Sequence, residues 1–307
     1  MSFESYLQEL ADPAKPLAVS KLVKLSSLGP DEASLFLDRW PELDLRRRQR
    51  LVHELTDLAE DNVELNFDAV FFIALGDAGA DVRRDAIRGL WEYEGCDLID
   101  PLQGLLQHDP DAGVRAEAAV ALGPFVLRAE FDSLRAADVE RVERTLRRTI
   151  EDTHEVCEVR GRALEALGAR SQPWVRDLIR KAYESPDRRL RLSAVHAMGR
   201  SCDTDWLLTI TPELASEDAE MRFEAASACG DIGDEAAIPH LLPLLYDEDQ
   251  DAQEAAVNAL GKIGGLRAKQ ALEELLEGAD ARVREAVLSA LAEMDFEEDP
   301  LGFRVRQ

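Results

Sequence analysis

The segment Leu190–Gly199, with the sequence LRLSAVHAMG, recurs as Met221–Gly230 (MRFEAASACG) and again as Ala252–Gly261 (AQEAAVNALG). Three further stretches have the same order of residue types: Val114–Gly123, Val159–Gly168 and Val283–Leu291. From the copy that starts at Val159 onward, the closing glycines follow one another every 31 residues. Self-similarity at a fixed period of this length is typical of a repeat protein, in which each copy is one supersecondary unit.

Each copy has the pattern of an amphipathic helix. An apolar residue and an arginine begin it, and small apolar residues follow at spacings of three and four, which places them on one helical face. Small side chains on that face allow neighbouring helices to approach closely. Carboxylates that can cap the free N–H groups stand just before the copies: Asp187, Asp218, Asp249 and Asp280. The closing glycine predicts a left-handed C-cap.

Second helical stretches lie between the copies, for example Ile238–Leu245 and Ala271–Leu276. Each unit is therefore an antiparallel helix pair, and neighbouring pairs stack to bury a shared core. Aromatic residues make up only 6% of the chain, and the apolar share relies on Ala and Leu, which are strong helix formers. The sequence predicts an all-α fold, an α-solenoid (superhelix) of stacked antiparallel helix pairs with a period of 31 residues.

The regularity of the array changes along the chain. We expect an N-terminal helical cap over residues 1–44, a repeat array over 45–294 and a C-terminal tail over 295–307. The unit at 124–168 is longer than the others and irregular. Long insertions in regular folds are often functional, so its extra residues, within 124–154, are a second candidate contact region.

The units resemble HEAT-like repeats of the short type found in phycobiliprotein lyases and in many bacterial and archaeal scaffolds. The resemblance rests on the recurring pattern of an apolar residue, Arg and Ala that ends in Ala-Leu-Gly, and it covers roughly residues 80–294. It implies a solenoid. It does not choose a function, because scaffolds and enzymes share this fold.

Charge and composition argue against several classes of protein. The chain has 36 Lys and Arg against 62 Asp and Glu, a formal charge of −26, which opposes the basic patches that nucleic-acid binding requires. Such acidity either solvates the chain or attracts a basic partner. No apolar stretch approaches the ~20 residues of a membrane span. The four cysteines form no CxxC pair and the N-terminus does not resemble a signal peptide, so we expect reduced thiols and a cytoplasmic location.

The residues give little support to an enzymatic function. HEAT-repeat hydroxylases of the deoxyhypusine type hold iron with His-Glu pairs directly after the repeat arginine, whereas the pairs here, at His53 and His154, lie elsewhere and Phe223 occupies the expected position. Nothing marks the bilin pocket of a chromophore lyase. Cys157 stands three residues after His154, a spacing that chance neighbours also give. We assign no catalytic residue, metal ligand or cofactor.

A candidate binding surface lies on the positions that follow the repeat arginines. Leu192 and Phe223 occupy neighbouring steps of one ladder, where other units have Gly or Glu, and would form an apolar patch if this ladder faces solvent. The alternative is that both side chains pack against the preceding unit. Four polar residues would form the rim of the patch: His196, Arg200, Glu224 and Asp231. Apolar centres with polar rims are typical of protein interfaces.

The sequence therefore favours a non-enzymatic scaffold or adaptor that binds a protein or peptide, a basic one if the charge acts in recognition, on the inner face of a solenoid. The alternative is an enzyme or enzyme subunit of HEAT-repeat type, either chromophore lyase-like or metal-dependent hydroxylase-like. The repeat arginines would bind an anionic ligand or, as we expect, pair with aspartates and bridge successive units. Partner, pathway and oligomeric state do not follow from the residues.

Overall fold

The computed structural model describes residues 2–278 and 280–298, and within these ranges all regular structure is helical. The chain forms two compact units. The first contains the described residues up to Phe125 together with Leu134–Thr149, and the second contains Val126–Ser133 together with the described residues from Ile150 onward. Helices α8 (Gly123–Glu130) and α9 (Ala136–Glu151) contribute residues to both.

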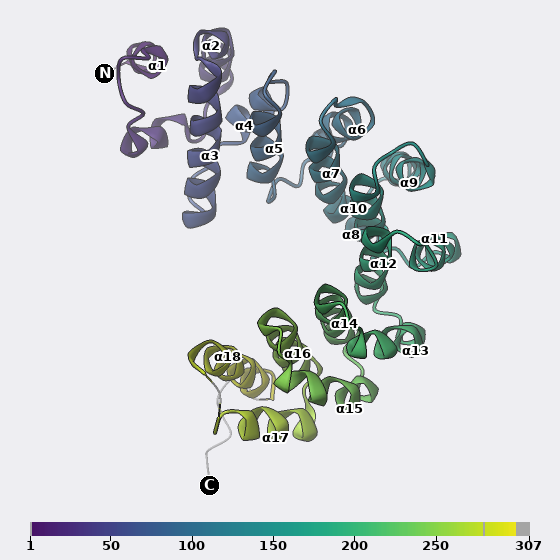
Figure 1. The fold of residues 1–307 in the computed structure, drawn as a ribbon. Helices are drawn as coiled ribbons and strands as arrows, with labels where there is room; N and C mark the ends of the chain where they lie inside the picture. The colour runs from purple at the N-terminus through teal and green to yellow at the C-terminus, as the bar shows by residue number, and fades with distance from the viewer. Residues whose placement is uncertain (1, 279, 299–307) are drawn as a thin grey trace. The chain divides into compact units, whose positions relative to one another are not determined.

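The first unit is a stack in which α3, α5 and α7 pack side by side, α4 packs on α5 and α6 packs on α7 (Figure 1). From the N-terminus to α7, the elements of this unit are α1 (Phe3–Ala11), η1 (Val19–Leu25), α2 (Pro30–Arg39), η2 (Trp40–Glu42), α3 (Leu45–Asp61), α4 (Asp68–Ala74), α5 (Ala80–Gly89), η3 (Cys96–Leu98), α6 (Ile99–His108) and α7 (Ala112–Ala121).

The second unit repeats one helix pair. Its elements are α10 (Cys157–Leu167), α11 (Pro173–Tyr183), α12 (Arg188–Arg200), η4 (Thr204–Trp206), α13 (Leu207–Ile210), η5 (Thr211–Ala215), α14 (Ala219–Ile232), η6 (Glu235–Ala237), α15 (Ile238–Leu241), η7 (Leu242–Tyr246), α16 (Gln250–Ile263), α17 (Gly265–Leu275) and α18 (Ala281–Glu298). The helices that carry the repeat motif, α10, α12, α14, α16 and α18, follow one another along one side, and we call them the inner helices (Figure 1). Helices α11, α13, α15 and α17 lie along the other side. The all-α solenoid predicted from the period is confirmed.

Aspartates start α12, α14, α16 and α18, as predicted. The side chains of Asp187, Asp218 and Asp249 accept hydrogen bonds from backbone N–H groups in the first turns of α12, α14 and α16. Asp280 accepts one from the N–H of Val283, at 2.9 Å. Each carboxylate satisfies donors that have no partner inside the helix, and this fixes where the helix begins.

The closing glycines have another role than the predicted one. The left-handed C-cap is wrong, because Gly199, Gly230 and Gly261 lie inside α12, α14 and α16, and positive φ angles occur at Gly233 and Gly264 instead. A Cβ atom on Gly199 would lie 2.6 Å from the Cα of Ala228 on the next inner helix. The same close approach joins Gly168 to Ala197, Gly230 to Ala259 and Gly261 to Ala290. The glycines therefore permit backbone contact between successive inner helices.

Repeat arginines connect inner helices to the segments before them, whereas α16 has Gln253 at this position. Arg222 donates from Nη1 to the carbonyl of Ser216, and the same six-residue step joins Arg191 to Ser185. Arg222 also forms a two-bond ion pair with Asp247, with both N–O distances at 2.7 Å. In the first unit, Arg83 does the same, with a bond to the carbonyl of Asp77 and a buried two-bond pair with Asp109. The predicted bridging role is confirmed for Arg222, and Arg83, which was not among the predicted arginines, has the same role in the first unit.

The predicted segments map onto the elements as follows. Residues 1–44 contain α1, η1, α2 and η2, and α3 begins at Leu45. The inserted residues at 124–154 form α8 and α9. The predicted tail at 295–307 begins inside α18, which runs to Glu298, and its residues 299–307 lie outside the described residues.

Candidate functional site

Phe223 stands on the solvent-facing side of α14 at the edge of a groove. Its side chain is 37% exposed, although it is aromatic and lies in the middle of the unit. The groove has a volume of about 360 Å³ and spans three inner helices, α14, α16 and α18. Its lining residues are Phe223, Ser227, Ala255, Asn258, Ala259, Lys262 and Glu293. We call this the Phe223 groove.

Leu192 does not belong to this surface. Its side chain is 1% exposed, so the predicted apolar patch that joins Leu192 to Phe223 is wrong. The reason lies in the contact between α10 and α12. Ser193 Oγ donates to Glu165 Oε1 at 2.7 Å and Arg189 Nη2 donates to the same atom at 2.9 Å, and these bonds hold α12 against α10 next to Leu192. Of the two ladder residues, only Phe223 faces solvent.

Glu165 is the centre of a buried polar cluster on the first inner helices. Besides Ser193 and Arg189, Arg162 donates from Nη1 to its second oxygen at 2.9 Å. A buried carboxylate needs such partners, because an unpaired charge inside a protein is costly. With three donors its bonding capacity is largely used, so we assign this cluster a structural role between α10 and α12.

The predicted rim residues split into paired and free groups. His196 Nδ1 lies 3.2 Å from Glu224 Oε2, and this hydrogen bond to a carboxylate raises the pKa of His196 against the opposing effect of burial. Asp231 pairs with Lys262 at 2.8 Å. The side chain of Arg200 is exposed and has no hydrogen bond or ion pair within residues 2–278 and 280–298. The histidine pair, the lysine pair and Phe223 thus lie on adjacent inner helices.

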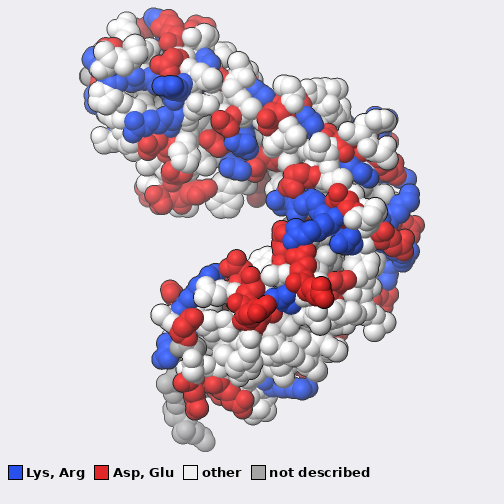
Figure 2. All heavy atoms as spheres, in the orientation of Figure 1, with Lys and Arg blue, Asp and Glu red and all other residues white. Residues whose placement is uncertain are grey.

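Charges of both signs occur together on this face. Figure 2 shows basic and acidic side chains next to each other over α10, α12 and α14 of the second unit. On α18, Arg282 pairs with Asp251 and Glu254 of α16, at 2.8 and 2.7 Å. These ion pairs join α16 and α18, which line the Phe223 groove together with α14.

The residues considered for catalysis are not brought together. His53 is exposed on α3 and lies 3.7 Å from Asp57, whereas His154 is almost fully exposed and lies 3.3 Å from Asp152. Burial raises the pKa of the Cys157 thiol, whose hydrogen-bond partner is Asp187. The part of the chain that the structure describes contains no group of three or more His, Cys, Asp or Glu residues arranged to hold a metal ion. Likewise, none of the described helices combines the length and apolar content needed to cross a lipid bilayer.

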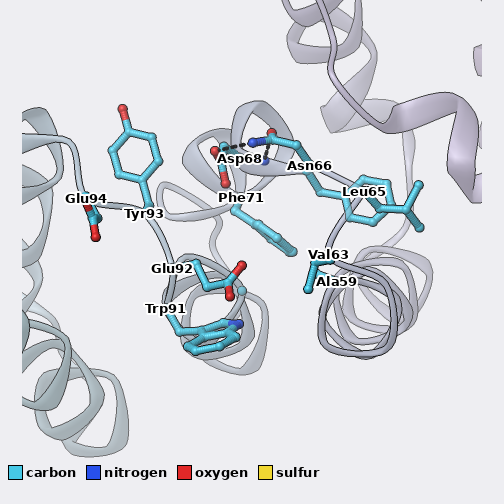
Figure 3. Close-up of a pocket in the computed structure, with 12 residues that line it drawn as sticks. Ala59, Val63, Leu65, Asn66, Asp68, Phe71, Trp91, Glu92, Tyr93 and Glu94 are labelled. Atoms are coloured by element: carbon cyan, nitrogen blue, oxygen red, sulfur yellow. Dashed lines mark hydrogen bonds between the residues drawn. The ribbon is translucent and has the colours of Figure 1, made fainter. Parts of the chain in front are cut away.

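A second pocket, in the first unit, was not anticipated from the sequence. It has a volume of about 220 Å³ and lies where α3 ends, α4 begins and α5 ends (Figure 3). Phe71 points into it, and Trp91 and Glu92 lie on one side with Val63 and Ala59 opposite. Trp91 is 59% exposed and Val63 is 80% exposed. We call this the Trp91 pocket.

One sequence signal could have pointed to this pocket. In the copy from Val82 to Trp91, tryptophan stands where the regular copies have their closing glycine. A side chain of that size cannot occupy the close helix contact seen in the second unit, so the chain must leave the regular pattern there. It does so directly after Leu90, the C-cap of α5.

Comparison with known proteins agrees with this architecture. A family model described as HEAT repeats matches residues 69–153 and 207–292. No curated protein matches the sequence. Among solved structures, the complex of CpcE and CpcF of phycocyanin lyase from Nostoc sp. PCC7120 is similar over 92% of this chain and 97% of that chain, with 19% identity and a TM-score of 0.53.

Two other solved structures are similar over nearly their whole length. One is YibA of Escherichia coli, with 17% identity over 92% of this chain and 99% of that chain, and a TM-score of 0.47. The other is human deoxyhypusine hydroxylase in complex with glycerol, with 20% identity over 95% of this chain and 97% of that chain, and a TM-score of 0.37. At these identities the similarity concerns the fold alone.

Proposed function

The chain belongs to the HEAT-repeat family, and from this premise we propose that it is a non-enzymatic scaffold or adaptor that binds a segment of a partner protein in the Phe223 groove. The observation that carries the proposal is an exposed phenylalanine in a groove that crosses three inner helices. A bound apolar side chain would remove this ring from water. Aromatic anchors of this kind, surrounded by polar groups, provide much of the binding energy of protein interfaces.

The surroundings of the groove indicate what the partner segment contains. Ala255 and Ala259 provide a shallow apolar floor, whereas Asn258, Lys262 and Glu293 offer polar groups at its edges. A segment that fits has an apolar residue for Phe223 and polar residues on either side. The net charge of −26 further favours a basic partner, whose association would slow as salt screens the attraction.

The alternative is an enzyme or enzyme subunit, chromophore lyase-like or metal-dependent hydroxylase-like. Residues 2–278 and 280–298 contain no group of three or more His, Cys, Asp or Glu side chains that could hold the metal of a hydroxylase, and the similarity to the phycocyanin lyase complex concerns the fold. Stoichiometric iron or zinc in the purified protein would contradict the proposed non-enzymatic role. A cytoplasmic location stays a prediction.

A charge placed in the groove tests the proposal. We expect Phe223→Glu to lower recovery of specific partner proteins from source lysate at least tenfold, because the carboxylate would have to be desolvated against an apolar ligand. The matched control is Leu208→Glu, which introduces the same charge at a residue of α13 that is 87% exposed and lies outside the groove. Quantitative mass spectrometry of the recovered proteins compares both variants with the wild type.

Two outcomes would contradict the proposal. Equal loss in both variants would mean that added negative charge, and not the groove, determines recovery. Unchanged recovery with Phe223→Glu would remove the groove from the interface. Circular dichroism of both variants checks that the helices remain, since Phe223 is only partly covered and its replacement is not expected to unfold α14.

A further inference from the structure

We propose that the Trp91 pocket of the first unit accepts an arginine side chain of a partner protein, with the guanidinium stacked on the Trp91 indole and paired with Glu92. The pocket is distinct from the Phe223 groove and lies in the other unit. The inference rests on the proposed function only in taking the ligand to be a protein segment. Three observations support it: the exposure of the pocket residues, the charge of the pocket, and the arginines that cover Trp206 and Trp40 elsewhere in this chain.

The first observation is that the pocket exposes apolar surface that the rest of the unit buries. Trp91 and Val63 are both more than half exposed, whereas Phe67 and Phe71 below them are buried. Gly89 allows this floor to form, because a Cβ atom there would lie 2.4 Å from the Phe71 ring. The pocket is therefore a built hollow with a rigid aromatic floor and an open, apolar entrance.

The second observation is the sign of the charge. Three carboxylates line the pocket, those of Asp68, Glu92 and Glu94, and no lysine or arginine does. Asp68 already accepts a hydrogen bond from Asn66 Nδ2 at 2.7 Å. Glu92 has no hydrogen bond or ion pair within the described part of the chain, and Figure 3 shows its side chain on the same side of the pocket as Trp91. A cation therefore fits the pocket, and an anion does not.

The third observation is an internal precedent in the second unit. Arg176 lies over the Trp206 ring at 5.1 Å from its centroid. The same guanidinium pairs with Asp203 at 2.7 Å and with Asp205 at 3.0 Å. The tryptophan, the carboxylates and the arginine together form one closed arrangement, and Trp206 is buried.

The first unit contains the same arrangement once more. Arg48 lies 5.9 Å from the Trp40 ring centroid and pairs with Asp77 at 2.9 Å, while Trp40 Nε1 donates to Asp77 at 2.8 Å. Trp91 with Glu92 has the aromatic face and the carboxylate of these two sites, and within residues 2–278 and 280–298 no cation covers it. We infer that a partner supplies the missing guanidinium.

Arginine fits this site better than lysine. Its planar guanidinium stacks on an indole and can donate two parallel bonds to one carboxylate, whereas an ammonium group acts as a compact, strongly hydrated point charge. The exposed Val63 and Trp91 edge would in addition contact an apolar residue next to the arginine. The expected ligand is thus an arginine flanked by an apolar residue in an extended segment.

The test uses the full chain, labelled with ¹⁵N, and the indole N–H signals of its four tryptophans. The Trp91 signal is assigned by its loss in Trp91→Phe. The probe is the peptide acetyl-Leu-Arg-Leu-amide, and its control contains citrulline, which keeps the shape of arginine but not its charge. We expect the Trp91 signal to shift with the arginine peptide, with a dissociation constant on the order of 1 mM, and binding of the citrulline peptide to be about tenfold weaker.

Matched variants separate the pocket from general attraction to an acidic protein. Glu92→Gln should weaken arginine-peptide binding about fivefold, a change of about 1 kcal/mol. Glu248→Gln removes the same charge from an exposed site in the second unit and should leave the Trp91 titration unchanged. Both side chains are exposed, so neither substitution is expected to alter the fold, and the remaining indole signals report on this.

Several results would overturn the inference. These are an unshifted Trp91 signal at 10-fold the expected dissociation constant, equal binding of the citrulline peptide, equal weakening by Glu248→Gln, or full competition by 1,4-diaminobutane at the same concentration as the peptide. The last would identify a site for small cations. Because Phe223→Glu should leave the Trp91 titration unchanged, failure here and failure of the Phe223 groove are distinguishable.

Discussion

The two units pack their helices with side chains of different size. In the second unit, glycine and alanine meet between successive inner helices, so that a Cβ on Gly230 would lie 2.8 Å from the Cα of Ala259. In the first unit, aromatic rings pack at α4, which lies against α5. Phe67 and Phe71 meet edge to face at 6.4 Å, and Phe72 meets Tyr93 in the same way at 5.1 Å.

The difference affects the surface as well as the core. Small residues bring the helices together at one fixed distance, so the surface above them is even and a single larger residue, Phe223, is enough to create a groove edge. Rings of different sizes produce uneven contacts, and the loops after α3 and α5 enclose the Trp91 pocket. Regular packing thus leads to a repeated surface and irregular packing to a local hollow.

The largest expected effect tests the arginine bridges that both units share. Arg83→Met should lower the free energy of unfolding by about 3 kcal/mol, because it leaves the buried Asp109 carboxylate without its cation. Arg222→Met should cost about 2 kcal/mol, since the Arg222–Asp247 pair is slightly more exposed. Urea unfolding followed by circular dichroism measures both.

The control for these variants is Arg180→Met. Arg180 pairs with Asp177 at 3.2 Å on the exposed side of α11, and the loss of such a pair changes stability by less than about 0.5 kcal/mol. If Arg83→Met were as mild as this control, the bridge would not connect the elements of the first unit as described.

The next effect concerns the glycines. Gly199→Ala should destabilise the second unit by about 2 kcal/mol, because its Cβ would lie 2.6 Å from backbone at Ala228, which cannot move away without shifting α14. Gly104→Ala in the first unit is the matched control, since no atom lies within 4 Å of the added Cβ there.

Within helix α6, replacement of Gly104 by alanine should be neutral or stabilising by about 0.5–1 kcal/mol, since alanine loses less backbone entropy on folding. The two substitutions are chemically identical, so opposite signs in the unfolding free energy would sharpen the contrast between the units. Equal signs would mean that the closing glycine does not mediate close contact.

The smallest effect is on pH dependence. The hydrogen bond to Glu224 raises the pKa of His196 above its ordinary value of about 6.5, so the protonated histidine stabilises the folded state. This contribution is fully present below the unfolded-state pKa and is lost as pH rises through the higher folded-state pKa. Because His196 is partly exposed, it should remain below about 1 kcal/mol.

Thermal unfolding at pH 5.5 and 8.5 measures this difference. The melting temperature of His196→Gln should fall further below that of the wild type at pH 5.5 than at pH 8.5. His53→Gln, in the first unit, replaces an exposed histidine 3.7 Å from Asp57 and serves as the control. A larger deficit for His196→Gln at pH 8.5 would reverse the sign and contradict the pairing with an ionised Glu224.

The sequence predicted the fold well because its signals are local. The capping aspartates and the three-and-four spacing each act within one helix, so Asp187 and Asp249 could be placed from the residues next to them. The role of Gly199 could not, because the contact with Ala228 joins residues on different helices. The period predicts that successive repeats contact each other, but it does not predict which atoms form the contact.

The candidate site was only partly predictable for the same reason. Leu192 and Phe223 are equivalent in the repeat, yet one is buried and the other exposed, since their cover comes from side chains elsewhere, such as the Glu165 cluster beside Leu192. The Trp91 pocket depends on Val63, which is distant in sequence and has no repeat equivalent. The exposure of a side chain depends on the residues of other helices that cover it. A single sequence does not show directly which residues these are.

The glycine and alanine contacts also fix the distance between successive inner helices of the second unit. Helices that touch through their backbones are spaced at the short end of the usual range, ~8 Å between axes. An extended peptide advances ~3.3 Å per residue, so a chain laid across the inner helices would meet a new helix every two to three of its residues. Each 31-residue repeat of this protein would then correspond to two to three residues of a peptide bound in this way.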